Sequence, residues 1–292
     1  MSFALPKQLE TRPMAVVGAG TLGRRIALML SLQGADVRIH ARTAASRDAA
    51  VAYALAKQPE VLPGVRHGRA GRIVAVDDLA AALEGAWLVV ESIPEDLSLK
   101  REMFRKLDAL APADAILATN SSSFASRDLV ASVAQPQRLL NAHFFMPPVV
   151  VPVELMSCGQ TDPAVIALLA QRLPAYGLSP YVVQTESMGF IYNRIWAAVK
   201  RETLLALADG VATPQALDAL YCEATGQRHG PCRIMDAVGL DVVLAIEEHY
   251  ASVREALPEA PRRLLETMIS EGRLGRKSGR GFYDYNSSSK LR

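Results

Sequence analysis

The chain has 292 residues, 50% of them apolar, which is enough to build one large domain or two ordinary domains with a substantial core. The formal net charge is only +2 and charges of both signs are mixed, so neither nucleic acid nor an anionic membrane is an expected partner. The three cysteines have neither disulfide nor metal-ligand spacing, and we recognise neither a signal peptide nor a membrane-spanning run, so we expect a soluble, cytoplasmic protein without a metal site.

Residues 14–34 predict a buried strand, a glycine turn and a helix in immediate succession. The turn has the GxGxxG pattern, in which Gly18 forms the turn, Gly20 lets backbone amides approach a pyrophosphate, and Gly23 lets the helix pack on the strand. A phosphate would bind at the N-terminus of the helix, where N–H groups lack partners. The alternative is a structural turn without a ligand. The expected cofactor-binding residues of this segment are Gly18, Gly20, Thr21, Leu22 and Gly23.

Residues 37–41 predict a second strand, which completes a strand, helix, strand unit around the glycine motif. In such a unit, an acidic residue at the end of the second strand usually binds the ribose 2′-hydroxyl of NAD. This chain has Ala41, Arg42 and Thr43 there. Because a guanidinium can bind a 2′-phosphate through two charge-assisted hydrogen bonds, the sequence favours NADP over NAD, with Arg42 as a cofactor-binding residue. The alternative is that Arg42 is a solvated surface charge.

Strands and helices continue to alternate up to residue 186. The expected elements are a helix over 43–57, a loop over 59–71, strands over 73–76, 87–93, 115–118 and 139–145, and helices over 79–83, 97–110 and 127–133. The pattern ends with a strand over 149–156, a helix over 163–176 and a strand over 181–184. Strands that alternate with helices predict an α/β fold with a parallel, doubly wound, Rossmann-like sheet.

From residue 187 onward, the sequence changes to helices without intervening strands. One long helix is expected over 190–209, another begins at Pro214, and at least two more follow between 231 and 270. The expected domains are a dinucleotide-binding Rossmann-like domain over 1–186 and an all-helical domain over 187–292, which serves the substrate and dimerisation.

The first long helix of the second half has an apolar face formed by Ile191, Ile195, Ala198, Leu205 and Leu207. We expect this face in the core. A long apolar helix that opens a second domain often doubles as a contact between domains or subunits, so we also expect a homodimer with the C-terminal helices as a twofold contact.

Polar side chains that could carry chemistry lie in three stretches, at 118–124, 141–155 and 188–195. The first two follow or form strand ends on the same side as the glycine loop, where ligands bind in open α/β sheets. His143 and Glu154 lie on consecutive extended segments, so they can meet without a long loop. A histidine paired with a carboxylate is a suitable base for alcohol oxidation, because the carboxylate orients the ring and stabilises the imidazolium. The alternative for His143 alone is a core histidine in an aromatic stretch.

Six motifs occur in a fixed order along the chain: GAGTLG, ATNSS, AHFF followed by prolines, GFIYNR, AVGLD and KSGRGFYDY. In this order and approximate spacing, the chain resembles the 3-hydroxyacyl-CoA dehydrogenase family from residue 14 to residue 285. The resemblance implies an N-terminal Rossmann-like domain and a helical C-terminal domain that forms the dimer contact. It also implies hydride transfer between a nicotinamide cofactor and C3 of a 3-hydroxyacyl or 3-oxoacyl group, as in fatty acid metabolism.

The resemblance further implies roles for individual residues. By motif, His143 resembles the general base and Glu154 the carboxylate that orients it. Ser122 resembles the hydroxyl that hydrogen-bonds the reacting oxygen, and Asn193 resembles a polar group that steers the substrate. These four residues form the expected catalytic set.

Three charged residues resemble cofactor contacts of the family. Glu95 and Lys100 follow the VVESI strand, and Lys277 lies in the RKSGRGF motif. Without the resemblance, each of the three would be interpreted as a solvated surface charge.

The chain also departs from the family pattern. The segment between the second strand and VVESI is shorter than in CoA-using members, whose lysine-rich helical arm there helps to hold CoA. The spacing from His143 to Glu154 is shortened, and Met146 stands where the family usually has Asn. Basic residues that could partly compensate for the missing arm are Lys57, Arg66, Arg69 and Arg72.

We therefore expect an NAD(P)-dependent oxidoreductase that acts on a small β-hydroxyacyl or β-keto substrate, with a CoA thioester as one form of it. The first alternative is the same chemistry on a free hydroxy acid or a non-CoA β-keto compound. The second alternative is a nucleotide-binding protein without turnover. The intact set of catalytic residues argues against the second alternative, because binding alone does not require a base.

Overall fold

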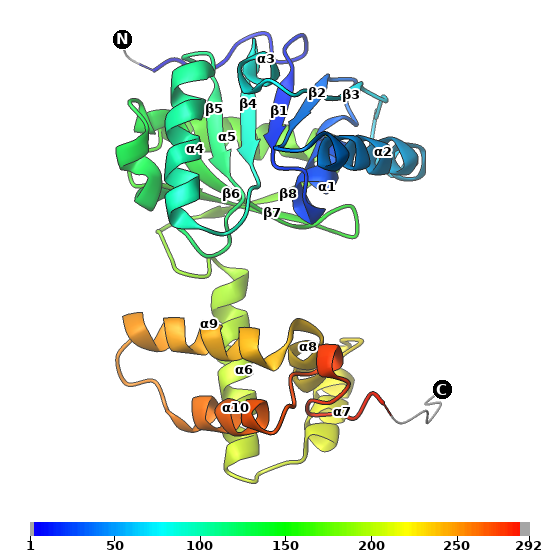
Figure 1. Cartoon of the computed structure of the whole chain (residues 1–292), viewed down its shortest axis with the longest axis vertical. Helices are drawn as coiled ribbons and strands as arrows, with labels where there is room; N and C mark the ends of the chain where they lie inside the picture. Colours follow the sequence, from blue (N-terminus) through cyan, green and yellow to red (C-terminus); the bar gives the residue numbers. More distant parts are fainter. Residues whose placement is uncertain (1–2, 287–292) are drawn as a thin grey trace. The chain divides into compact units, whose positions relative to one another are not determined.

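The structure is a computed structural model that describes residues 3–286 (Figure 1). It consists of two compact units that divide between Ile191 and Tyr192, whereas the change in composition places the boundary at residue 186. The first unit contains a sheet with helices, and the second is built from helices. Within the described part of the chain, no helix combines the length and the apolar character needed to cross a membrane.

A single sheet of eight strands forms the centre of the first unit. The strands are β1 (Met14–Val17), β2 (Val37–His40), β3 (Ile73–Ala75), β4 (Leu88–Glu91), β5 (Ile116–Thr119), β6 (Leu139–Met146), β7 (Val150–Ser157) and β8 (Ser179–Val183). They lie in the order β3-β2-β1-β4-β5-β6-β7-β8, and β1 to β6 run parallel. The strand order changes direction between β1 and β4, which is the position where doubly wound sheets bind ligands.

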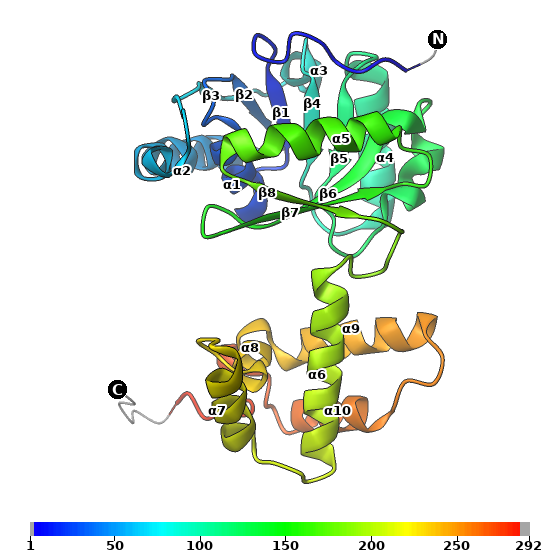
Figure 2. The same ribbon diagram turned by 180° about the vertical axis from the view of Figure 1, so that it is seen from behind.

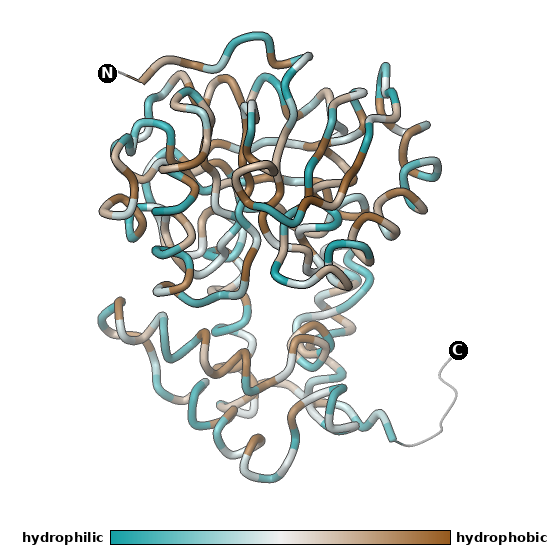
Figure 3. The backbone as a smooth tube through the Cα atoms, turned by 45° about the horizontal axis from the view of Figure 1, so that its top comes forward, coloured by the Kyte–Doolittle hydropathy of each residue, from teal (hydrophilic) through white to brown (hydrophobic). Residues whose placement is uncertain are grey.

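Helices cover both faces of this sheet. The helices are α1 (Thr21–Leu30), α2 (Ala44–Val61), α3 (Leu79–Leu83), α4 (Leu97–Leu110) and α5 (Pro163–Arg172), with short 3-10 helices η1 (Leu62–Gly64), η2 (Ser126–Ser132), η3 (Pro136–Arg138) and η4 (Leu173–Tyr176). Apolar residues of α1, α2 and α5 pack on one face, where Figure 2 shows α5 crossing the sheet, and those of α3, α4 and η2 pack on the other. The central strands β1 and β4 are therefore buried on both sides, and their apolar residues contribute to the apolar stretches of the backbone in Figure 3.

The last two strands differ from the parallel sheet that the sequence predicts. Strand β7 pairs antiparallel with β6, and β8 then pairs parallel with β7. The reason is the length of the connection, because only residues 147–149 join β6 to β7, and a parallel pair needs a crossover of a dozen or more residues. The resulting hairpin aligns His143 directly opposite Glu154.

Helix α2 is longer than the sequence predicts. The expected loop over 59–71 begins only after Val61, because Pro59 lies inside the last turn of the helix. The carbonyl four residues before a proline loses its partner, but Leu55 is 47% exposed, so water can reach this part of the helix surface. At the other end, Thr43 is the N-cap, and its side-chain oxygen accepts a hydrogen bond from the Ser46 N–H.

The second unit contains the helices α6 (Tyr192–Ala208), α7 (Pro214–Thr225), α8 (Pro231–Val238), α9 (Leu240–Val253) and α10 (Ala260–Ser270), and the 3-10 helix η5 (Arg276–Ser278). Pro214 occupies the first turn of α7, as predicted. Residues of α6, α8, α9 and α10 form the core together with Phe282. The segment after η5 is held by the buried carboxylate of Asp236, which accepts hydrogen bonds from the N–H groups of Phe282 and Tyr283 and from the Tyr285 hydroxyl.

The apolar face of α6 that the sequence assigns to the core is wrong in its first half, whereas Leu205 and Leu207 are partly buried and Leu207 packs against the core. Ile195 is 60% exposed and Ala198 is also exposed. The helix instead buries Ala197 and Leu204, which lie seven residues apart and therefore share one side of the helix. An apolar surface on α6 is thus left uncovered within its own unit.

Candidate active site

A pocket of about 650 Å³ lies in the first unit at the carboxyl ends of β1, β2, β4 and β5. Its walls are formed by residues 17–22, 40–43, 46, 92–95, 99, 100, 103 and 120–122. Most of the residues expected to bind a cofactor are among them: Gly18, Gly20, Thr21, Leu22, Arg42, Glu95 and Lys100. The pocket therefore spans the point where the strand order changes direction, as ligand sites in doubly wound sheets do.

The glycine turn between β1 and α1 is fixed by backbone packing. Gly18 has φ of +118°, and a Cβ atom there would overlap the carbonyl oxygen of Ser92. A Cβ atom at Gly23 would overlap the carbonyl oxygen of Gly18, so the start of α1 can approach β1 only if this residue is glycine. A Cβ atom at Gly20 would meet no atom within 4 Å. Gly20 thus leaves open space at the N-terminus of α1, which fits a dinucleotide phosphate.

The wall of the pocket beyond β2 carries positive charge. Arg42 is exposed and lies next to Ala41, Thr43 and Ser46 along the wall. Among residues 3–286, no carboxylate pairs with its guanidinium group, and the adjacent N-terminus of α2 adds the positive end of a helix dipole. This part of the pocket can receive an anionic group.

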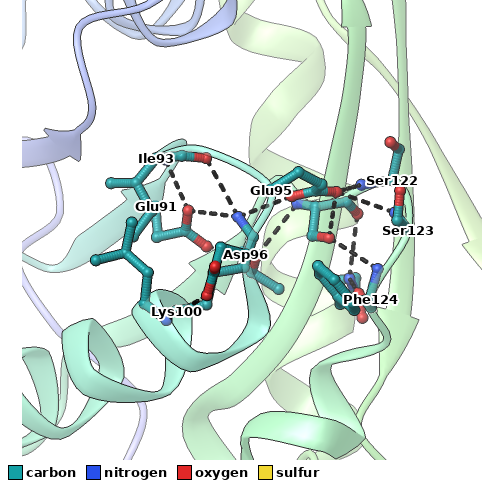
Figure 4. Close-up of polar contacts among 12 residues, drawn as sticks. Glu91, Ile93, Glu95, Asp96, Lys100, Ser122, Ser123 and Phe124 are labelled. Carbon is teal, nitrogen blue, oxygen red and sulfur yellow. Dashed lines mark hydrogen bonds and ion pairs between the residues drawn. The ribbon is translucent and has the colours of Figure 1, made fainter.

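A buried polar network lies on the other side of the pocket, at the end of β4 and the start of α4 (Figure 4). The Lys100 side chain is only 1% exposed, so its interpretation as a solvated surface charge is wrong. Its Nζ lies 2.8 Å from Oε1 of Glu91, which is fully buried, and 3.0 Å from Oε2 of Glu95. Glu91 also accepts hydrogen bonds from the Thr119 hydroxyl at 2.6 Å and the Ile93 N–H at 2.7 Å.

The Glu95 carboxylate connects this network to the loop after β5. Its Oε1 accepts hydrogen bonds from the Ser121 hydroxyl at 2.6 Å, the Ser122 N–H at 3.0 Å and the Ser123 N–H at 3.1 Å. Burial works to raise the pKa of the Glu95 carboxyl, but the Ser121 hydrogen bond and the Lys100 charge outweigh it and hold the pKa below its ordinary value. The carboxylate is therefore charged near neutral pH.

The same loop is also attached to β6, the strand that carries His143. Asn120 Oδ1 accepts from the Phe144 N–H at 2.8 Å, and Asn141 Oδ1 accepts from the Ser126 N–H at 2.6 Å. Asn141 lies two residues before His143, so both side chains point to the same face of the sheet. The loop that carries Ser122 is thus hydrogen-bonded to β6, the strand that carries His143.

His143 and Glu154 form a buried pair across the β6–β7 hairpin. The His143 Nδ1 lies 2.9 Å from the Glu154 Oε2, and the two side chains are 10% and 3% exposed. The other carboxylate oxygen of Glu154 accepts from the Ile191 N–H at 2.9 Å. The imidazole also stacks on Phe190, with the ring centroids 4.8 Å apart. Since Nδ1 faces the carboxylate, Nε2 is the ring nitrogen that this pair leaves for another partner.

Two expected site residues lie in the helical unit. Asn193 is in the first turn of α6, and its backbone carbonyl accepts from the Tyr250 hydroxyl at 3.4 Å. Lys277 is in η5 and forms an ion pair with Asp241 of α9. Their part in the site remains a prediction from the resemblance.

Sequence reasoning missed Glu91, Thr119 and Asn141 as supports of the site. A signal for Glu91 was present, because it is a carboxylate at the end of an apolar strand that the pattern predicts to be buried, and buried carboxylates need partners. Thr119 and Asn141 gave no comparable signal, because a polar residue at a strand end is common.

Two family models match nearly the whole chain. The NAD binding domain of 3-hydroxyacyl-CoA dehydrogenase matches residues 13–186, and the C-terminal domain of 3-hydroxyacyl-CoA dehydrogenase matches residues 189–285. The chain belongs to the 3-hydroxyacyl-CoA dehydrogenase family. The family and the Rossmann-like fold class that the sequence predicts are thus confirmed, and the protein is a nicotinamide-dependent oxidoreductase that acts on CH–OH groups.

Relatives and solved structures span the same two domains. The chain is 30% identical over 279 residues to 3-hydroxybutyryl-CoA dehydrogenase of Clostridioides difficile, which covers 94% of this chain and 99% of the relative. It is 30% identical over 282 residues to 5-formyl-3-hydroxy-2-methylpyridine 4-carboxylate 5-dehydrogenase of Mesorhizobium japonicum, with 94% and 91% covered. The crystal structure of (S)-3-hydroxybutyryl-CoA dehydrogenase from Ralstonia eutropha has a TM-score of 0.84 at 28% identity, with 95% and 100% covered. The names of these relatives describe substrates with a CoA thioester and a substrate without one.

Proposed function

We propose that the protein interconverts a 3-hydroxyacyl group and the matching 3-oxoacyl group, with His143 as the acid and base. The observation that carries this proposal is the buried His143–Glu154 pair, whose geometry leaves Nε2 of the imidazole for the substrate. A nicotinamide, when bound, exchanges the hydride with C3 of the substrate. In the oxidation direction, His143 Nε2 takes the hydroxyl proton, and Glu154 stabilises the imidazolium that forms. Ser122 donates a hydrogen bond to the reacting oxygen, and Asn193 steers the substrate.

A panel of cofactors and β-hydroxy or β-keto substrates, followed at the absorbance of reduced nicotinamide, tests this function. We expect turnover with at least one pair and its loss in His143→Gln. If the parent protein binds a dinucleotide but turns over no β-hydroxy or β-keto compound, the alternative of a non-catalytic nucleotide-binding protein is correct.

A second candidate function is the same chemistry on a free hydroxy acid or a non-CoA β-keto compound. In the region where CoA-using members carry a lysine-rich arm, ion pairs neutralise two of the four basic residues, whereas the exposed Arg66 and Arg69 form no ion pair among the described residues. Lys57 pairs with Glu60 and Arg72 pairs with Asp36, both at the protein surface. Comparison of acetoacetyl-CoA with acetoacetate and longer keto acids separates the candidates. A kcat/KM at least tenfold higher for the thioester supports the CoA form, and the reverse ratio supports the free acid.

We propose NADP(H) as the preferred cofactor. The support is the exposed Arg42 on the pocket wall, the absence of an acidic residue from the described lining beside β2, and the N-terminus of α2 next to it. Together these groups favour the additional negative charge of a 2′-phosphate over a 2′-hydroxyl.

We also propose a homodimer that forms through the helical unit. The support is apolar surface that this unit leaves uncovered: Ile195 on α6, and Val242, Ile246 and Val253 along α9, with 60%, 43%, 36% and 58% exposed. Val242, Ile246 and Val253 follow helical spacing and therefore form one stripe. We expect light scattering to give twice the chain mass at micromolar concentration, and Ile246→Glu to lower it. A monomer mass for the parent protein would reject the dimer.

A further inference from the structure

Helix α1 carries two neighbouring cations that have no acidic partner. Arg24 and Arg25 are partly buried, and their guanidinium carbons lie 4.4 Å and 5.6 Å from the centre of the Tyr53 ring on α2. Within residues 3–286, neither guanidinium forms an ion pair with a carboxylate. Two cations held beside one ring repel each other, and the aromatic face offsets this only in part. An anion bound near both would remove the repulsion.

The hydrogen bonds of this pair leave most of its donors free for a ligand. Arg25 Nη1 donates to the Pro147 carbonyl at 2.9 Å, and Arg24 forms no hydrogen bond among the described residues. The Nε atoms of both arginines are buried without a partner among the same residues. Each guanidinium has five N–H donors in one plane, and stacking on an aromatic ring holds that plane in place. The Nη groups of Arg24 are therefore oriented and ready to donate to an oxyanion.

The two arginines lie outside the dinucleotide pocket but next to the hairpin that carries His143. Thr21, one turn before Arg25, lines the pocket, whereas neither arginine does. Pro147 directly follows β6, and Figure 1 shows α1 between α2 and the β6–β7 hairpin. Pro147 comes four residues after His143, which corresponds to about 14 Å along an extended strand. A long substrate that reacts at His143 can therefore reach the arginines, and a short one cannot.

We infer that Arg24, Arg25 and Tyr53 form a site for an anionic group of the substrate, a carboxylate or a phosphate, roughly 10 to 14 Å from the carbon that exchanges the hydride. The inference rests on the proposed function, which places that carbon beside His143. Arginine suits both groups, because its fork of donors matches two oxygens at once. A CoA thioester carries phosphates at its far end, and a long free diacid carries a second carboxylate. The carboxylate of acetoacetate is only two bonds from the keto carbon, so it does not reach this site.

Binding measurements on the double variant Arg24→Gln with Arg25→Gln test the inference. The probes are coenzyme A and azelate, a nine-carbon dicarboxylate, titrated calorimetrically into protein saturated with NADPH so that neither probe occupies the dinucleotide pocket. We expect at least one probe to bind the parent protein and to bind the double variant at least about tenfold more weakly. Arg24→Gln alone, which removes no hydrogen bond between described residues, should weaken binding about three- to tenfold. The matched control is Arg105→Gln on α4, an exposed arginine on the other face of the sheet, which should leave the Kd unchanged.

The two probes also separate the two sources of the anion. Binding of coenzyme A alone assigns the site to phosphate, binding of azelate alone assigns it to carboxylate, and binding of both supports a site for either group. The inference is overturned if neither probe binds the parent protein at millimolar concentration, or if the double variant binds as tightly as the parent. A loss of about tenfold in NADPH affinity in the double variant also overturns it, because the arginines would then be cofactor ligands. None of these measurements needs turnover, so a protein that is inactive on every β-hydroxy substrate contradicts the proposed function and leaves the binding test standing.

Discussion

The two ends of the dinucleotide pocket are built in different ways. At the end near β4 and β5, buried ion pairs and a loop tied to two elements determine where each polar group lies, and Lys100 and Glu91 are almost completely removed from water. At the end near β2, Arg42 is an exposed side chain on a short loop, and none of the described carboxylates holds it. The first end is fixed before any ligand arrives, and the second is open to solvent.

This difference follows from what each end has to do. Proton and hydride transfer require groups placed to within a fraction of an ångström, which a rigid support provides at the cost of burying charge. Discrimination between two cofactors requires only a difference in charge at one position, which a single exposed side chain supplies. We therefore expect substitutions in the hairpin that carries His143 to change turnover, and substitutions beside Arg42 to change cofactor preference alone.

The largest effect is expected for His143→Gln. Glutamine keeps polarity and approximate size but cannot exchange a proton, so turnover should fall by about 10² to 10⁴. The Kd for the dinucleotide should change little, because His143 does not line the pocket that contains the glycine turn. Steady-state kcat and a fluorescence titration of reduced cofactor check both parts. Near parental turnover, with chemistry shown to be rate-limiting, would remove His143 from the mechanism.

The next largest effect tests the open end of the pocket. The double change Ala41→Asp with Arg42→Gln introduces a charge that repels a 2′-phosphate and removes the group proposed to bind it. A charge-assisted contact of this kind contributes about 1.5 to 3 kcal/mol, so the ratio of kcat/KM for NADP to that for NAD should fall roughly ten- to a hundredfold. Turnover at saturating cofactor should stay, because the nicotinamide end is untouched.

The control for this change is Arg105→Gln on α4, an exposed arginine outside the pocket lining, which should leave the cofactor ratio unaltered. A parent protein that already favours NAD, or an Arg42→Gln variant with an unchanged NADP constant, would mean that Arg42 is a solvated surface charge.

Glu154→Gln should have a smaller effect than His143→Gln, because the imidazole keeps a hydrogen-bond partner and loses only the counter-charge of the imidazolium. We expect a loss of roughly tenfold in kcat. Glutamine has one oxygen where the carboxylate has two, so keeping the His143 Nδ1–H contact leaves the Ile191 N–H without an acceptor, and thermal unfolding should shift by several degrees. A kcat loss as large as that of His143→Gln would mean that the carboxylate does more than orient and stabilise the ring.

The parts of the fold that the sequence predicts well are those set by local patterns. The apolar runs predict strands β1 to β6, and the spacing of apolar residues predicts α4 with its observed ends. Pro214 correctly predicts the start of α7. The direction of β7 could have been derived from the short connection around Pro147, but alternation of strands and helices alone suggests a parallel strand. The exposure of Ile195 could not be derived, because an apolar helix face is the same in sequence whether its own unit or a second subunit covers it.

The site was predictable to a different degree at its two ends. The glycine turn and Arg42 are read directly from residue type and position, because each acts through its own backbone or charge. The support of the Ser122 loop could not be predicted, because it depends on contacts of Lys100 with Glu91 and Glu95. Spacing along the chain does not show which oxygen a buried ammonium faces. Sequence reasoning identified the groups proposed to touch ligands more readily than the groups that hold them in place.

The smallest expected effect separates two hydroxyls at the open end. The Thr43 side chain accepts from the Ser46 N–H at 3.2 Å and donates to the Ser46 Oγ at 2.7 Å, so it serves as the cap of α2 and has no donor left. The Ser46 hydroxyl keeps its own hydrogen and lines the pocket, so it can donate to a phosphate oxygen. Ser46→Ala should therefore weaken NADP binding about two- to tenfold and leave NAD binding and stability unchanged. Thr43→Ala should instead lower the free energy of unfolding by about 0.5 to 2 kcal/mol, because it removes the cap. Equal weakening of both cofactors in Ser46→Ala would place the 2′-phosphate elsewhere, whatever the role of Arg42.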